Sequence, residues 1–146
     1  GTALKETKNV GVFNIDRLKC MVEVCKNFNI LSKEHNGDYL TKEEINLRFN
    51  NGLNSLNIAP EFGVYETNLL LDNIKNKEHF NTIYKICLDS DKWKKWVSND
   101  FNPNENKRKI IEICGHYVNN QIKEIIKPNN DIIKQKIKYK LKELYT

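Results

Sequence analysis

An all-α fold is the fold class that the sequence predicts, and three observations support it. Apolar residues recur at helical spacing through most of the chain, several of these stretches follow a residue that can cap a helix, and no two segments pair as alternating strands. A chain of 146 residues also falls within the size range of one domain. We therefore expect residues 1–146 to form a single helical domain, a compact, disulfide-stabilised bundle of about six to seven helices.

The first part of the chain predicts two helices. Asn14 can cap a helix over residues 14–28, whose apolar residues share one face. Thr41 and Glu44 have the spacing of a capping box, which predicts the start of a second helix. The apolar spacing after this box continues as far as Leu56, so we expect the second helix to extend that far.

The middle of the chain predicts three further helices. Pro60 suits the first turn of a helix that runs roughly to Asn73. Asn76 can cap the next one. A short helix then carries Trp93 and Trp96.

The last part of the chain predicts a long helix and a terminal one. After a polar loop at residues 98–105, apolar residues recur at close to heptad spacing as far as Lys127, where Pro128 ends the helix. A last helix opens near Asn130. Residues 134–142 alternate as a strand would, but the wider apolar spacing and the lack of a partner strand favour a helix.

Residues 14–75 and 77–145 share several landmarks that indicate an internal repeat. The pairs that align under a nearly constant shift are Cys20 with Cys87, Phe49 with Tyr117 and Pro60 with Pro128. Two similar three-helix units would explain these pairs. The alternative is coincidence between helices of similar composition.

Four cysteines, Cys20, Cys25, Cys87 and Cys114, favour disulfides because their number is even in a short chain. Cys20 and Cys25 lie about 140° apart on one predicted helix, so they cannot bond to each other without unwinding it. The remaining pairings are Cys20–Cys87 with Cys25–Cys114, or Cys20–Cys114 with Cys25–Cys87. The alternative is four reduced thiols that act as small apolar residues.

No motif predicts catalysis, a cofactor or a metal. The sequence has no glycine-rich phosphate loop, nucleophile elbow or HExxH motif. Cys114 and His116 would lie on opposite sides of a helix, which does not suit a zinc site. We therefore expect a protein that is not an enzyme and has no catalytic, cofactor-binding or metal-ligating residues.

Trp93, Trp96 and Phe101 form the aromatic cluster that we consider as an interaction or ligand surface. Large aromatic side chains at helical spacing are more typical of a core. If the cluster is a site, it would hold a small apolar molecule between helices.

Positive charge is concentrated at the end of the chain. Residues 107–146 contain ten Lys or Arg and four Asp or Glu, so ten minus four gives a net charge of +6. Lys134, Lys138 and Lys142 recur every fourth residue and could form an interaction surface. Because Arg is scarce, we expect no nucleic-acid partner, and no apolar run is long enough to span a membrane.

A helical chain biased towards Asn, Lys and Ile, with cysteines and tyrosines in each half, resembles the aphid salivary effectors called BICYCLE proteins. Tyr84 lies near Cys87, and Tyr117 lies near Cys114. The resemblance implies a secreted, non-enzymatic saliva protein that is delivered into host tissue. It further implies a function on plant cells through binding of an unknown host protein. No binding residue can be carried over from that family.

Two alternatives belong to other classes. One is a helical carrier of small hydrophobic ligands, similar to the insect odorant-binding proteins, although the six-cysteine spacing of that group is absent. The other is an exported or surface protein of a parasite with an A/T-rich genome, which would share this composition.

Overall fold

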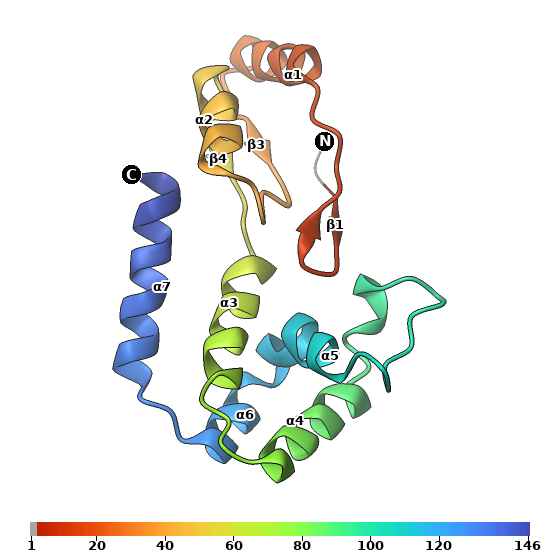
Figure 1. Ribbon diagram of the computed structural model, residues 1–146. Coiled ribbons are helices and arrows are strands. Elements are labelled where there is room, and N and C mark those ends of the chain that lie inside the picture. Colours follow the sequence, from red (N-terminus) through yellow and green to blue (C-terminus); the bar gives the residue numbers. More distant parts are fainter. Residues whose placement is uncertain (1–2) are drawn as a thin grey trace. The chain divides into compact units, whose positions relative to one another are not determined.

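The computed structural model describes residues 3–146 and is mostly helical, which confirms the predicted fold class (Figure 1). Its α-helices are α1 (Ile15–Asn27), α2 (Lys42–Asn50), α3 (Pro60–Leu71), α4 (Lys77–Asp89), α5 (Lys107–Cys114), α6 (Asn119–Ile126) and α7 (Asn130–Tyr145). Its 3₁₀ helices are η1 (Lys94–Trp96) and η2 (Gly115–Val118). Its short strands are β1 (Leu4–Lys5), β2 (Lys8–Asn9), β3 (Lys33–Glu34) and β4 (Ser55–Leu56).

The chain divides into two compact units, and the expectation of a single domain stays a prediction. Unit 1 comprises the described residues up to Ala59 together with Lys142–Thr146, and unit 2 comprises Pro60–Leu141. Each unit buries its own apolar residues, which is the physical reason for the division.

The boundary at Pro60 differs from the one expected for an internal repeat, between residues 75 and 77. The elements differ too, because the stretch 14–75 contains the β3–β4 pair, whereas 77–145 contains two 3₁₀ helices. Cys20 is exposed and its proposed counterpart Cys87 is buried. The structure therefore offers no support for two equivalent three-helix units.

The helix starts agree with the capping residues in the sequence. The side chains of Asn14 and Asn76 each accept a hydrogen bond from the backbone N–H three residues on, at 2.8 and 2.7 Å. Thr41 Oγ1 accepts from Glu44 N at 3.2 Å, and Glu44 Oε2 accepts from Thr41 N at 2.7 Å. The capping box is therefore complete.

Three predicted helices are longer than the observed ones. The second helix ends at Asn50, because Gly52 turns the chain with a φ of +90° and the following residues enter β4. The predicted long helix is interrupted after Cys114 by η2, and α6 ends where Lys127 adopts a left-handed conformation. The predicted short helix at the tryptophans is only the 3₁₀ turn η1.

The four strands were not expected from the sequence. β1 and β2 form an antiparallel hairpin, and β3 pairs in parallel with β4, with Lys33 opposite Ser55 and Glu34 opposite Leu56. Each strand has two residues, which is too short for a pattern of alternating polarity to appear.

The core of unit 2 is built from α3, α4, α5 and α6, which pack against one another (Figure 1). Its fully buried side chains are mostly aliphatic and include Leu70, Ile83, Ile110, Ile111 and Ile122. The start of α7 adds Ile133 to this core. Lys140 Nζ, further along α7, lies 3.2 Å from Glu61 Oε1 on α3.

Unit 1 has a much smaller apolar core. Leu18 and Val22 of α1 are buried against Leu53, and Phe13 and Met21 pack beside them. A core of this size leaves a large share of the stability to polar contacts. None of the described helices of either unit is long and apolar enough to cross a membrane.

Candidate ligand-binding site

The candidate site is a pocket in unit 1 with a volume of about 650 Å³. We call it the α1 pocket. Most of its walls are apolar or sulfur-containing side chains, with polar residues contributed by β3 and the segment after it. The lining residues are Phe13, Asn14, Arg17, Leu18, Cys20, Met21, Val24, Cys25, Lys33, Glu34, His35 and Asn36.

One wall of the pocket is a face of α1. Arg17, Met21 and Val24 follow one another at intervals of four and three residues, so their side chains lie on the same side of the helix. Cys20 and Cys25 flank this row. α1 therefore has two apolar faces, because Leu18 and Val22 are also buried in the core of unit 1.

The opposite wall of the pocket lies alongside α1 because the chain reverses its direction at the end of this helix. Asn29 has a φ of +53°, its N–H donates to Lys26 O, and Ile30 N donates to Cys25 O, both at 2.9 Å. These bonds form a Schellman motif, which caps the last carbonyls and reverses the chain. Asparagine tolerates the left-handed conformation better than most residues. The residues from Ile30 onward then return towards the start of α1.

The returning segment is held in place by the turn before β4. Ser32 is buried, and its N–H and hydroxyl both donate to Asn54 Oδ1, at 3.0 and 2.9 Å. Asn57 N donates to Glu34 O at 2.9 Å. This wall of the pocket therefore has fixed backbone anchors on both sides of β3.

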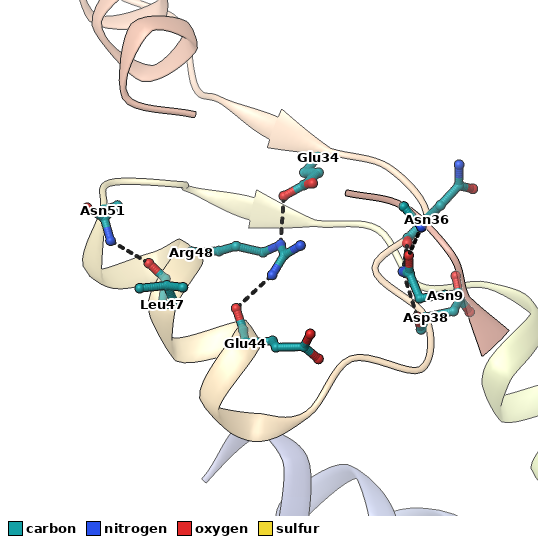
Figure 2. A network of polar contacts seen from close by, with 9 residues as sticks. Asn9, Glu34, Asn36, Asp38, Glu44, Leu47, Arg48 and Asn51 are labelled. Carbon is teal, nitrogen blue, oxygen red and sulfur yellow. Dashed lines mark hydrogen bonds and ion pairs between the residues drawn. The ribbon is translucent and has the colours of Figure 1, made fainter. Parts of the chain in front are cut away.

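Arg48 connects α2 to two pocket residues, and its contact with one of them, Glu34, is shown in Figure 2. Its Nε donates to Glu34 Oε2 at 3.0 Å, and its Nη1 donates to Glu44 O at 2.9 Å. Its guanidinium also lies 4.2 Å from the ring centroid of Phe13. Since Arg48 is only 2% exposed, these contacts form largely out of water and hold Phe13 and Glu34 in place.

The charge of the pocket lining is positive. Arg17 and Lys33 are exposed, and within residues 3–146 neither side chain forms an ion pair. Glu34 is the one carboxylate of the lining. Its charge is neutralised by Arg48, which does not itself line the pocket. His35 lines the same edge and lies 3.3 Å from Asn57 Nδ2 through its Nδ1.

The cysteines are arranged differently from both predicted disulfide pairings. All four thiols are free. Cys20 and Cys25 line the α1 pocket, where Cys20 is exposed and Cys25 half-buried. Cys87 and Cys114 are fully buried together in unit 2, where Cys114 Sγ lies 3.6 Å from Cys87 O. Neither predicted pairing is present among these thiols, since each assigns Cys87 and Cys114 to different bridges, whereas α4 and α5 place them side by side.

The aromatic cluster belongs to unit 2. Trp93 is 8% exposed, its Nε1 donates to Leu88 O at 3.2 Å, and its ring lies 6.1 Å from that of Phe101. Trp96 and Phe101 are half-buried and pack against the same core. None of the three lines the α1 pocket.

The predicted basic surface lies on α7. Lys134, Lys138 and Lys142 are exposed and follow one another every fourth residue, so they share one side of the helix. No ion pair with these lysines is present among the described residues. None of these lysines is among the residues that line the α1 pocket.

The histidines and cysteines of the described residues are not grouped as metal ligands would be. Among residues 3–146, no group of three or more His, Cys, Asp or Glu side chains is placed to hold a metal ion. His116 lies against Tyr117, with ring centroids 4.0 Å apart. Burial, together with the charge of Lys95, lowers the pKa of His116, which favours the neutral imidazole.

The sequence analysis missed the α1 pocket. Its one visible signal was the row formed by Arg17, Met21 and Val24, because these positions add a second apolar face to a helix whose first face already serves the core. The other wall could not be found, since it depends on the chain reversal at Asn29 and on contacts with residues more than 20 positions away.

Comparison with known proteins found no match for the chain among family models, curated proteins or solved structures.

Proposed function

We propose that this protein is a non-enzymatic binding protein whose unit 1 holds a small apolar or amphipathic molecule in the α1 pocket. The observation that carries the proposal is the pocket itself. Its volume of about 650 Å³ lies within the range of about 300–1,000 Å³ that is typical of small-molecule sites. Six of its twelve lining residues are apolar or sulfur-containing and six are polar or charged, so the pocket can both cover an apolar molecule and orient a polar group.

The structural setting of the pocket supports binding rather than catalysis. Its apolar wall is a regular helix, and its polar wall is fixed by the Ser32–Asn54 contacts and by Arg48. A pocket with anchored walls loses little conformational entropy when it binds a ligand. This proposal corresponds to the carrier alternative considered from the sequence.

The experiment is a titration with N-phenyl-1-naphthylamine, a neutral apolar probe whose fluorescence rises in an apolar site. We expect saturable binding at micromolar concentration. Val24→Asp should weaken binding at least tenfold, because it places a charge in the apolar wall.

Asn27→Asp is the matched control for this substitution. It introduces the same charge at an exposed position of the same helix, outside the pocket lining, and should leave probe affinity within about twofold. Absence of saturable binding by the wild-type protein, or an equal loss in both variants, would rule out the α1 pocket as the site.

A second candidate is the protein-binding effector function that the resemblance to BICYCLE proteins implies. One observation favours it: Phe28, Ile30 and Leu31 are 74%, 59% and 80% exposed at the end of α1. Exposed apolar side chains that adjoin in sequence are typical of protein-binding surfaces. We therefore propose a host plant protein as the partner, with a secreted protein delivered into host tissue.

This second candidate requires a comparison between variants. The wild-type protein and Phe28→Ser/Leu31→Ser would be cross-linked in plant-cell extract, with Lys134→Ser/Lys138→Ser as the control on another helix. A partner that is captured by the wild type and the control but lost in the first variant would support the candidate. Identical capture by all three would exclude these side chains as the binding surface.

A further inference from the structure

The charges around the α1 pocket define the class of ligand. We infer that the pocket takes single-chain amphiphiles with an anionic head, such as a fatty carboxylate, in preference to neutral apolar molecules of the same length. This inference rests on the proposed function, since it names the ligand of the same pocket.

The first step is the separation of apolar and charged groups within the lining. Met21 and Val24 form the apolar wall along α1, together with Leu18. Arg17 lies one turn earlier on α1, and Lys33 and His35 lie on the returning segment. The lining therefore combines an apolar surface for a hydrocarbon chain with basic groups for a polar head.

The second step is the availability of the two cations. The Arg17 guanidinium and the Lys33 ammonium form no ion pair within residues 3–146, and both residues are exposed. A cation that has no partner in the protein can form an ion pair with an anionic ligand. Arg17 can also bind a carboxylate through two parallel N–H groups.

The third step concerns Glu34, which would otherwise repel an anion. Its Oε2 lies 3.0 Å from Arg48 Nε, and the Arg48 side chain is 3% exposed. Arg48 is itself outside the pocket lining, so its charge cancels that of Glu34 without occupying the site. The groups that remain uncompensated at the pocket are the positive ones, which selects an anionic head.

The experiment compares two competitors that differ in the head group alone. Dodecanoate and dodecanol would each displace N-phenyl-1-naphthylamine from the wild-type protein at low ionic strength, below the concentration at which dodecanoate forms micelles. We expect dodecanoate to displace the probe at a concentration about three- to tenfold lower than dodecanol, from two exposed charge contacts. Added salt should reduce this ratio because it screens the charges.

Arg17→Gln/Lys33→Gln should bring the ratio of the two competitors close to one while leaving dodecanol binding unchanged. The matched control is Lys19→Gln/Lys26→Gln, which removes two exposed cations of α1 that do not line the pocket, and it should keep the wild-type ratio.

The outcomes separate this inference from the proposed function. Equal displacement by both competitors, or an unchanged ratio in Arg17→Gln/Lys33→Gln, would overturn the anionic head while keeping the apolar pocket. Failure of the probe and of both competitors to bind would overturn the proposed function and this inference together.

Discussion

Arg48 Nε lies 3.0 Å from Glu34 Oε2, and the two side chains are only 3% and 15% exposed. The same guanidinium donates to Glu44 O and covers the ring of Phe13. A single side chain of α2 thereby joins α2, β3 and the segment before α1. Because the apolar core of unit 1 is small, we expect the stability of unit 1 to depend on this contact.

Arg48→Met tests this dependence. It would leave Glu34 withdrawn from water without its partner, and removal of one member of a buried ion pair costs about 3–5 kcal/mol. We expect a loss of this order in the free energy of unfolding of unit 1, measured by urea denaturation with circular dichroism. Arg108→Met, which removes an exposed arginine of α5, should cost less than about 1 kcal/mol.

Arg48→Met/Glu34→Gln provides the cross-check on that result. Glutamine carries no charge to leave unpaired, so the double variant should recover part of the stability lost in Arg48→Met. If Arg48→Met unfolds at the same urea concentration as Arg108→Met, the contact is not important for unit 1.

The four thiols should divide into two classes by reactivity. Cys20 and Cys25 line an open pocket, whereas Cys87 and Cys114 are fully buried in unit 2. The neighbouring Cys114 thiol, together with burial, raises the pKa of Cys87, which suppresses its reactive thiolate. With Ellman's reagent we expect two thiols to react in the folded protein and four in denaturant.

Mass spectrometry under non-reducing conditions checks the same arrangement independently. The purified protein should have the mass of four free thiols, and alkylation before unfolding should label Cys20 and Cys25 but not Cys87 or Cys114. A loss of four hydrogens would restore the disulfides predicted from the sequence and contradict the observed thiols.

Gly115→Ala should destabilise unit 2 even though alanine favours helical backbone. Gly115 has a φ of −56°, so its backbone suits any residue, but a Cβ there would lie 2.4 Å from Thr67 Cγ2. Overpacking of this kind costs about 1–3 kcal/mol. We expect a lower thermal midpoint for Gly115→Ala, measured by circular dichroism.

Thr67→Ser should rescue Gly115→Ala. It removes the clashing Cγ2 and keeps the hydroxyl, which donates to Gly63 O at 2.8 Å. Because that oxygen would lie 2.9 Å from the new Cβ, we expect the rescue to be partial. Thr67→Ser alone serves as the reference. If the double variant is as unstable as Gly115→Ala, close packing against the Thr67 methyl group is not the cause.

The lowered pKa of His116 predicts how the stability of unit 2 depends on pH. Burial and Lys95 lower its pKa in the folded state, whereas the unfolded chain has a value near 6.5. Below that pH the unfolded state binds more protons, so stability falls as the pH decreases through about 6.5 and is full above it.

His116→Gln should remove this contribution. We expect its urea midpoint to change less between pH 7.5 and 5 than that of the wild-type protein, whereas His35→Gln, in unit 1, should keep the wild-type dependence of unit 2. Parallel pH profiles of the wild type and His116→Gln would show that His116 is not responsible.

The sequence by itself determined the fold class and most helix starts, because these depend on local contacts. Asn14, Thr41 with Glu44, and Asn76 each satisfy backbone groups within three residues, so their roles can be read without the rest of the chain. The terminal helix was predicted for the same reason, from the spacing of its own apolar residues.

Only the folded structure reveals where the two longer predicted helices end, which cysteines meet and where the α1 pocket lies. η2 lies where Gly115 packs against Thr67, and Cys87 meets Cys114 because α4 packs on α5. The α1 pocket needs Glu34, Arg48 and Phe13 from three segments. Contacts between residues distant in sequence leave no local pattern, so only the folded chain reveals them.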